Sequence, residues 1–157
     1  MSISILRLDD RLVHGQVVVG WGNALGIDRI VLVDDTVSET QWEQELYSMG
    51  VPECMAVDFV SVAQARQRLS EWAVNEEKVI LIVGDVAGLV SLCHESAVVS
   101  EINLGGLHRS AGRRERLPYI FLTDAEFVLL EELERRSISI TAQDLPATRP
   151  VPLGELA

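Results

Sequence analysis

One short segment holds most of the residues that could do chemistry. An apolar run over residues 3–8 leads into Asp9-Asp10-Arg11, and His14 follows just ahead of a second apolar segment. A neutral imidazole nitrogen can attack a phosphoryl group. An arginine guanidinium presents a planar fork of donors that suits phosphate oxygens. The segment therefore predicts a site that carries a phosphoryl group on His14.

The neighbours of His14 are predicted to support this chemistry. Arg11 is expected to neutralise and orient phosphate, the alternative being a surface arginine paired with an acid. Asp10 is expected either to orient His14 or to hold Arg11. Gly15 is expected to matter because a Cβ there would crowd the phosphate or the start of the helix. Gln16 is expected to offer an amide donor, the alternative being an ordinary residue of the first helical turn.

A second polar segment lies far along the chain. Gly105-Gly106 is followed by His108 and by four arginines. This loop is predicted to close over the His14 site or to bind a partner, with a solvated loop histidine as the alternative. The arginines suit a docking rim or a surface that steers phosphate, unless they form an ordinary basic loop. They are Arg109, Arg113, Arg114 and Arg116.

Composition excludes several classes of function. The formal net charge is -11, which argues against nucleic-acid binding. No His, Cys, Asp or Glu residues have the spacing of metal ligands, so no metal is expected. Cys54 and Cys93 are predicted to be buried thiols in a reducing compartment. No signal peptide or membrane-spanning segment is visible, so a cytoplasmic location is expected.

The organisation of the chain predicts a single α/β domain over residues 1–157, with a mainly parallel central sheet. Short apolar runs alternate with amphipathic segments, which is typical of a parallel sheet covered by helices. Ligands of such sheets bind at the carboxyl ends of the strands, where the His14 loop would lie. The strands are expected at residues 3–8, 29–33, 55–60, 79–83, 101–104, 119–122 and 138–142.

Helices between these strands carry recognisable signals. Capping boxes are predicted to begin at Ser38, Ser61 and Thr123. Gly26 and Gly50 suit left-handed positions at helix ends. The tail, residues 144–157, is expected to run over the surface because it contains three prolines. Two stripes are predicted to face the core, namely Trp42, Leu46 and Met49, and Val62, Ala65, Leu69 and Trp72.

The segment at residues 8–17 closely resembles the His-loop of enzyme IIB components of the mannose/fructose/sorbose class of the bacterial phosphotransferase system. That loop typically reads Ile-Asp-Asp-Arg-Leu-Ile-His-Gly-Gln-Val and is soon followed by a tryptophan, here Trp21. Asp34-Asp35, residues 102–108 and residues 142–146 also fit the family pattern. The resemblance covers roughly the whole chain.

The resemblance implies a three-layer α/β/α fold with the first strand central. The loops around Gly84-Asp85 and Gly105-Gly106 would then flank His14. It also implies a phosphocarrier without an organic cofactor. His14 would accept phosphate at Nδ1 from a phosphorylated IIA partner and pass it to a hexose-type sugar bound by membrane IIC and IID permease subunits. A regulatory phosphocarrier without sugar transport remains open, as do the identity of the sugar and a homodimer.

Two features depart from the family pattern or from helix propensity. Many family members carry a cation in the loop after the fourth strand, where this chain has none, so Arg109 or Arg113 is expected to replace it. Gly20 and Gly22 lie within the first helix, and close packing against the sheet is the expected reason.

Dinucleotide binding is the rival from another class. Asp34 lies about twenty residues after the first turn, where a ribose-binding acid would be expected. That fold requires three glycines in the turn, however, and here Gly15 stands alone. Nucleotide binding is therefore not predicted.

Overall fold

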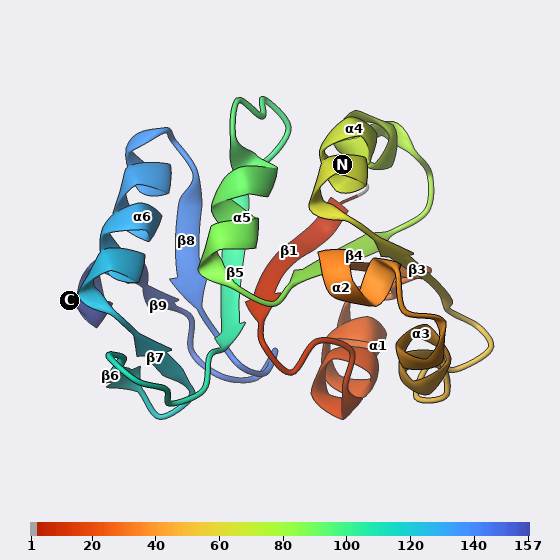
Figure 1. The fold of residues 1–157 in the computed structure, drawn as a ribbon, viewed down its shortest axis with the longest axis horizontal. Helices are drawn as coiled ribbons and strands as arrows, with labels where there is room; N and C mark the ends of the chain where they lie inside the picture. The colour runs from red at the N-terminus through yellow and green to blue at the C-terminus, as the bar shows by residue number, and fades with distance from the viewer. Residues whose placement is uncertain (1–2) are drawn as a thin grey trace.

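The computed structural model describes residues 3–157, which form a seven-stranded sheet in the order β3-β2-β4-β1-β5-β8-β9 and a separate two-stranded ribbon (Figure 1). The central sheet is parallel except for β9, which runs antiparallel to β8. The strands are β1 (Ile3–Asp9), β2 (Arg29–Val33), β3 (Ala56–Val60), β4 (Val79–Val83), β5 (Glu101–Gly106), β6 (Arg114–Leu117), β7 (Ile120–Leu122), β8 (Ser139–Ala142) and β9 (Val151–Pro152).

Helices cover both faces of this sheet. On one face, α4, α5 and α6 pack on a large core that includes Leu6, Leu81 and Leu104. On the other face, the first helical segment packs on a smaller core with Ile30 and Ile80. The helices are η1 (Gln16–Trp21), α1 (Gly22–Leu25), α2 (Asp35–Ser38), α3 (Gln41–Ser48), α4 (Val62–Val74), α5 (Val86–Cys93), α6 (Asp124–Arg135) and η2 (Leu153–Leu156).

The position of β1 follows from its neighbours. β4 is buried at every residue, as expected for a strand covered on both faces. β1 lies between β4 and β5, with Leu8 beside Val83 and Leu104. The predicted α/β class, the mainly parallel sheet and the central first strand are therefore confirmed, and the end of β1 lies between two other strand ends.

Local helix signals were reliable where the side chain caps its own helix. Ser61 and Thr123 form complete capping boxes at α4 and α6. The box predicted at Ser38 is wrong, because Ser38 ends α2 and its hydroxyl donates to the carbonyl of Asp35. The next helix, α3, has Thr40 at its N-cap, but the Thr40 hydroxyl donates back to the carbonyl of Thr36 and does not cap the helix.

The apolar stripe of α3 is exposed, which corrects the prediction that it faces the core. Trp42, Leu46 and Met49 are 65%, 58% and 83% exposed. Tyr47 instead packs against the smaller core. Periodicity identifies an apolar face but not which face the sheet covers. The stripe of α4 does lie in the core, through Ala65, Leu69 and Trp72, with Val62 partly buried against it.

The predictions for single glycines and cysteines were also partly confirmed and partly wrong. Gly26 adopts the left-handed conformation with φ 63°, as predicted, whereas within residues 3–157 the only other glycine with positive φ is Gly112, so the prediction for Gly50 is wrong. Cys93 is buried, and burial raises the pKa of its thiol to about 11. Cys54 is exposed, contrary to expectation, because it lies in the turn between α3 and β3.

The C-terminal tail contributes to the fold rather than only crossing its surface. Val151 and Pro152 pair with β8, and Leu153 and Leu156 are almost fully buried. Proline is compatible with this position because an edge strand has one side free of hydrogen bonds. The strand expected at residues 119–122 is present as β7, but it pairs with β6 in the separate ribbon and does not belong to the central sheet.

None of the helices within residues 3–157 has the length and apolar character needed to cross a membrane.

We expect Leu153→Ala to lower the free energy of unfolding by about 2–4 kcal/mol, because it removes a buried side chain and leaves a cavity. Leu46→Ala is the matched control, since Leu46 is exposed, and it should change stability by less than about 0.5 kcal/mol. Urea denaturation measures both. Equal effects of the two substitutions would contradict a structural role for the tail.

Candidate functional site

The loop that follows β1 lies between the loops that follow β4 and β5, as expected. The backbone N–H of Asp10 donates to the carbonyl of Gly106 over 3.0 Å. On the other side, Leu12 lies so close to Gly84 that a Cβ there would be 2.7 Å from its side chain. Leu12 itself has φ 61°, a left-handed conformation that costs a non-glycine residue energy. Contacts on both sides hold the loop in this shape.

His14 is oriented by Asp9. The imidazole Nε2 lies 3.0 Å from Oδ2 of Asp9, whose side chain is fully buried. A carboxylate can only accept hydrogen bonds, so Nε2 carries the proton and Nδ1 retains its lone pair. The backbone N–H of Gln16 lies 3.3 Å from Nδ1. With 18% of its side chain exposed, His14 can present Nδ1 to another molecule.

Asp9 is ionised because three donors surround it. Burial alone would raise the pKa of the Asp9 carboxyl, but hydrogen bonds from His14 and Arg11 and the charges of Arg7 and Arg11 hold it well below its usual 3.8. Two guanidinium groups against one carboxylate leave an excess of positive charge beside His14. This excess is local, because the chain as a whole is acidic.

Arg7 is the site residue that sequence reasoning missed. Its side chain is fully buried, and burial lowers the pKa of its guanidinium. Nε donates to Asp9 over 3.2 Å and Nη1 to Oδ1 of Asn103 over 2.6 Å, while the carbonyls of Gln143 and Asp144 accept from Nη1 and Nη2. The only sequence signal was a charged residue inside an apolar run.

The Gly105-Gly106 pair makes room for these arginines. A Cβ on Gly105 would overlap the guanidinium of Arg7, and one on Gly106 would lie 3.0 Å from Nη2 of Arg11. The glycines are therefore required by the close approach of side chains from β1 and from the loop that follows it, not by loop flexibility.

Arg11 binds Asp9 through two parallel hydrogen bonds. Nε and Nη2 donate to the two carboxylate oxygens over 2.9 and 2.8 Å, and Nη1 donates to Oε1 of Gln16 over 2.6 Å. Of the alternatives considered for Arg11, pairing with an acid is what the geometry contains, but the acid is buried and belongs to the site. With 29% of its side chain exposed, Arg11 can still approach a phosphoryl group beside His14.

Asp10 makes neither of the contacts expected of it. Its carboxylate accepts from the backbone N–H of His108 over 2.8 Å and lies 2.6 Å from Nδ1 of the same residue. Successive residues at a strand end point to opposite sides, so Asp9 turns inward and Asp10 turns outward. The orienting contact to His14 belongs to Asp9, and Asp10 orients His108, which is 68% exposed.

The arginines after Gly106 do not form one open basic rim. Arg113 forms a two-bond ion pair with Glu126, and Arg116 is 2% exposed and bonded to Asp124. Arg114 is exposed beside Asp124. Arg109 stacks over the ring of Phe121 at 5.3 Å. Within residues 3–157 no hydrogen bond joins Arg109 or Arg113 to His14, so replacement of the absent family cation stays a prediction.

The glycines around the first helical segment have different surroundings. A Cβ on Gly15 would meet no atom of another part of the chain within 4 Å, so the space beside His14 is open there. A Cβ on Gly22 would lie 2.9 Å from Met55, and one on Gly20 would touch Leu145. Both glycines are closely packed, but the prediction that they pack against the sheet is wrong, because their neighbours lie in the segment before β3 and in the C-terminal tail. The helix widens here into the π form, from Gln16 to Trp21.

The part of the chain that the structure describes contains no group of three or more His, Cys, Asp or Glu side chains arranged to hold a metal ion.

Comparison with known proteins gives a consistent result. The family model described as "PTS system sorbose subfamily IIB component" matches residues 3–157. The N-acetylgalactosamine-specific phosphotransferase enzyme IIB component 2 of Escherichia coli is 25% identical over 99% of this chain and 98% of its own. The mannose-specific EIIAB component of the same organism is 24% identical over 89% of this chain but 43% of its own.

The fold is also similar to that of a solved protein. The crystal structure of an N-acetyl-galactosamine IIB component from Streptococcus pyogenes superposes with a TM-score of 0.90 and 22% identity, over 99% of this chain and 97% of that one.

We expect Gly105→Ala to destabilise the protein by about 3 kcal/mol, because the buried Arg7 cannot move aside without losing its partners. Gly154→Ala is the control, since a Cβ there meets nothing within 4 Å. Thermal or urea unfolding compares the two. A Gly105→Ala protein as stable as the Gly154→Ala protein would contradict the close approach described for Arg7.

The lowered pKa of Asp9 predicts a pH dependence of stability. Below pH 3.8 the unfolded chain takes up a proton on Asp9 while the folded protein does not. The contribution of the ionised Asp9 to the free energy of unfolding is therefore fully present above pH 3.8 and decreases as the pH falls below it. The stability difference between wild type and Asp9→Asn should therefore be largest near neutral pH and shrink in acid. A difference that stays constant from pH 6 to pH 2.5 would refute the assignment.

Proposed function

Because the chain belongs to the sorbose subfamily of phosphotransferase-system IIB components, we propose that it carries a phosphoryl group on Nδ1 of His14. Members of this family are sugar-specific components of that system and act as phosphotransferases. The observation that supports the assignment to Nδ1 is the Asp9 hydrogen bond, which engages the protonated Nε2, whereas the lone pair of Nδ1 accepts only the longer hydrogen bond of 3.3 Å from the backbone N–H of Gln16.

The proposed transfer needs little movement within the site. The lone pair of Nδ1 attacks the phosphorus of a phosphohistidine on the partner, and the bond from phosphorus to the partner's imidazole nitrogen breaks in line. His14 keeps its Nε2 proton, so the phosphorylated ring gains positive charge, and the ionised Asp9 stabilises that charge. Transfer to an acceptor hydroxyl reverses the sequence, with the hydroxyl proton leaving to solvent or base as the P–N bond breaks.

Arg11 and Gln16 are proposed to bind the phosphoryl oxygens. The side chain of Arg11 donates to the side-chain oxygen of Gln16 over 2.6 Å, and the backbone N–H of Gln16 donates to Nδ1 over 3.3 Å. The open space at Gly15 accommodates the group. Positioned donors of this kind stabilise the charge that develops on phosphoryl oxygens during transfer.

The partners are proposed from the relatives. One relative is a fused EIIAB component, which supports a IIA protein or domain as the phosphoryl donor. Relatives named for N-acetylgalactosamine, sorbose and mannose support a hexose-type sugar, presented by membrane IIC and IID subunits, as the acceptor. The protein would act in the cytoplasm. The exposed loop around His108, with Arg109 and Arg113, is proposed to contact a partner.

We expect His14→Ala to abolish phosphorylation. The assay supplies phosphoenolpyruvate, the general phosphotransferase proteins and a IIA protein, and measures acid-labile phosphate on the chain. His108→Ala is the matched control, which should slow labelling without eliminating it. Labelled His14→Ala protein, or complete loss of label in His108→Ala alone, would show that the wrong histidine has been assigned.

Arg11→Lys should slow the transfer about 10- to 100-fold while the fold is retained, since lysine keeps the charge but loses the two-bond fork to Asp9 and a donor to phosphate. Rapid-quench measurements with phosphorylated IIA test this expectation. An unchanged rate would restrict Arg11 to a structural role.

If the chain is phosphorylated but passes no phosphate to sugar in membranes containing its permease, the regulatory alternative would replace transport.

A further inference from the structure

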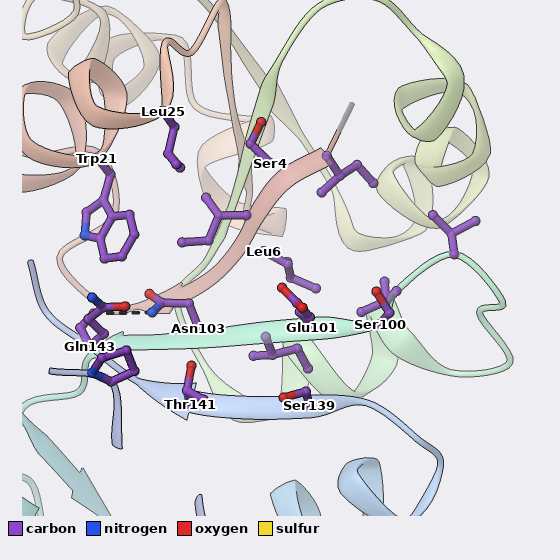
Figure 2. Close-up of a pocket in the computed structure, with 16 residues that line it drawn as sticks. Ser4, Leu6, Trp21, Leu25, Ser100, Glu101, Asn103, Ser139, Thr141 and Gln143 are labelled. Carbon is purple, nitrogen blue, oxygen red and sulfur yellow. Dashed lines mark hydrogen bonds between the residues drawn. The ribbon is translucent and has the colours of Figure 1, made fainter. Parts of the chain in front are cut away.

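A hollow of about 360 Å³ lies on the sheet face opposite α5 and α6 (Figure 2). β1, β5 and β8 form its floor, and the smaller helical core on this face includes no residue of β5 or β8. Trp21 and Leu25 stand at one side of the hollow, and the segment before β5 closes another. Its volume is within the range of sites that hold small molecules.

The lining is apolar for the larger part and also carries polar side chains that make no hydrogen bond to the described residues. Within residues 3–157 no hydrogen bond engages the side chains of Ser4, Ser139, Thr141 or Glu101, all of which line the hollow. Glu101 pairs in register with Ser139, and Asn103 with Thr141, so these groups form adjacent polar rows. Ile5 and the indole of Trp21 add apolar surface beside them.

The charge of the lining restricts the chemistry of a ligand. None of the described residues that line the hollow is a lysine, arginine or histidine, and Glu101 is the single charged group among them. An anion such as a phosphate or a sugar phosphate would meet no cation there. Several hydroxyl and amide groups beside an aromatic ring suit a neutral molecule with many hydroxyls and one apolar face.

Asn103 connects this hollow to the phosphorylation site. It is 6% exposed, and its Nδ2 makes one long hydrogen bond of 3.4 Å to the carbonyl of Gln143, which leaves a second Nδ2 proton free (Figure 2). Its Oδ1 accepts from Arg7 over 2.6 Å, Arg7 donates to Asp9 over 3.2 Å, and Asp9 holds His14 over 3.0 Å. Arg7 also stacks on Trp21 at 5.2 Å.

We propose that this hollow is a second ligand site, for a neutral polyhydroxylated molecule of monosaccharide size, and that its occupancy reaches His14 through Asn103, Arg7 and Asp9. A ligand that accepts a hydrogen bond from Nδ2 of Asn103 shifts the side-chain amide whose Oδ1 accepts from Arg7. Coupling between two sites is reciprocal. The factor by which the ligand changes the phosphorylation equilibrium of His14 is therefore also the factor by which phosphorylation changes the affinity of the hollow for the ligand.

The test measures binding to unphosphorylated protein, so its outcome does not depend on whether His14 accepts phosphate. ¹⁵N-labelled protein is titrated with D-mannose and with N-acetyl-D-galactosamine, and the signals of the Trp21 indole N–H and the His14 ring are followed. We expect saturable shifts of both for at least one sugar, with a Kd on the order of 1 mM. No saturable shift at Trp21 up to 50 mM of either sugar would overturn the site.

Two variants locate the binding. Thr141→Val keeps the shape of the side chain but removes a lining hydroxyl, so it should weaken binding about three- to tenfold. Thr36→Val, on α2 and outside the hollow, should leave the affinity unchanged. Ser139→Ala replaces Thr141→Val if that variant does not fold. Equal affinity in all variants would overturn the assignment to this hollow.

Two further comparisons test the ligand class and the coupling. D-mannose 6-phosphate should bind more weakly than D-mannose, and tighter binding of the phosphate would overturn the neutral class. A shift of Trp21 without any change at His14 would overturn the coupling through Asn103.

Discussion

The buried carboxylate of Asp9 is the interaction on which the site depends. A charge without water is tolerated only when ion pairs and hydrogen bonds replace its hydration, and Arg7, Arg11 and His14 together do this. The same bonds fix the position of Arg11 and the tautomer of His14. The Asp9 carboxylate therefore sets both the geometry of the site and the chemistry of His14. The stability of the fold is thereby linked to the ability of the imidazole to accept a phosphoryl group.

Positive charge reaches the site in an unusual way for so acidic a protein. Arg7 lies within β1, and acceptors on β5 and on the segment after β8 bind its guanidinium. It therefore adds positive charge without being exposed. Arg11 stands above it in the loop. A phosphoryl group would approach a local excess of positive charge that is rigidly held, which reduces the rearrangement needed at each transfer.

The sequence was most informative where the relevant residues are close together in the chain. His14 and Arg11 lie in one segment, and the capping boxes of α4 and α6 are complete within four residues, so each could be recognised directly. Arg7 could not, because its partner Asn103 lies 96 positions away in the sequence. Asp10 was misassigned for a related reason, since its partner His108 is 98 positions away.

The exposed stripe of α3 shows a different limit. Its apolar spacing is that of a buried helix, but whether a face is covered depends on the sheet and not on the helix. The tail was misjudged in the opposite direction: its prolines are compatible with an edge strand and with the short 3₁₀ turn that buries Leu153 and Leu156. Patterns of this kind describe what a segment can do alone, whereas burial depends on what lies beside it.

The short strand β9 gives the two edges of the sheet unequal properties. Pro152 in β9 and Pro150 just before it have no backbone N–H to offer, so this edge presents an incomplete row of donors to a further strand. The opposite edge is β3, which pairs on one side with β2 and contains no proline. Extension of the sheet by another polypeptide, whether in regular assembly or in aggregation, would therefore begin at β3.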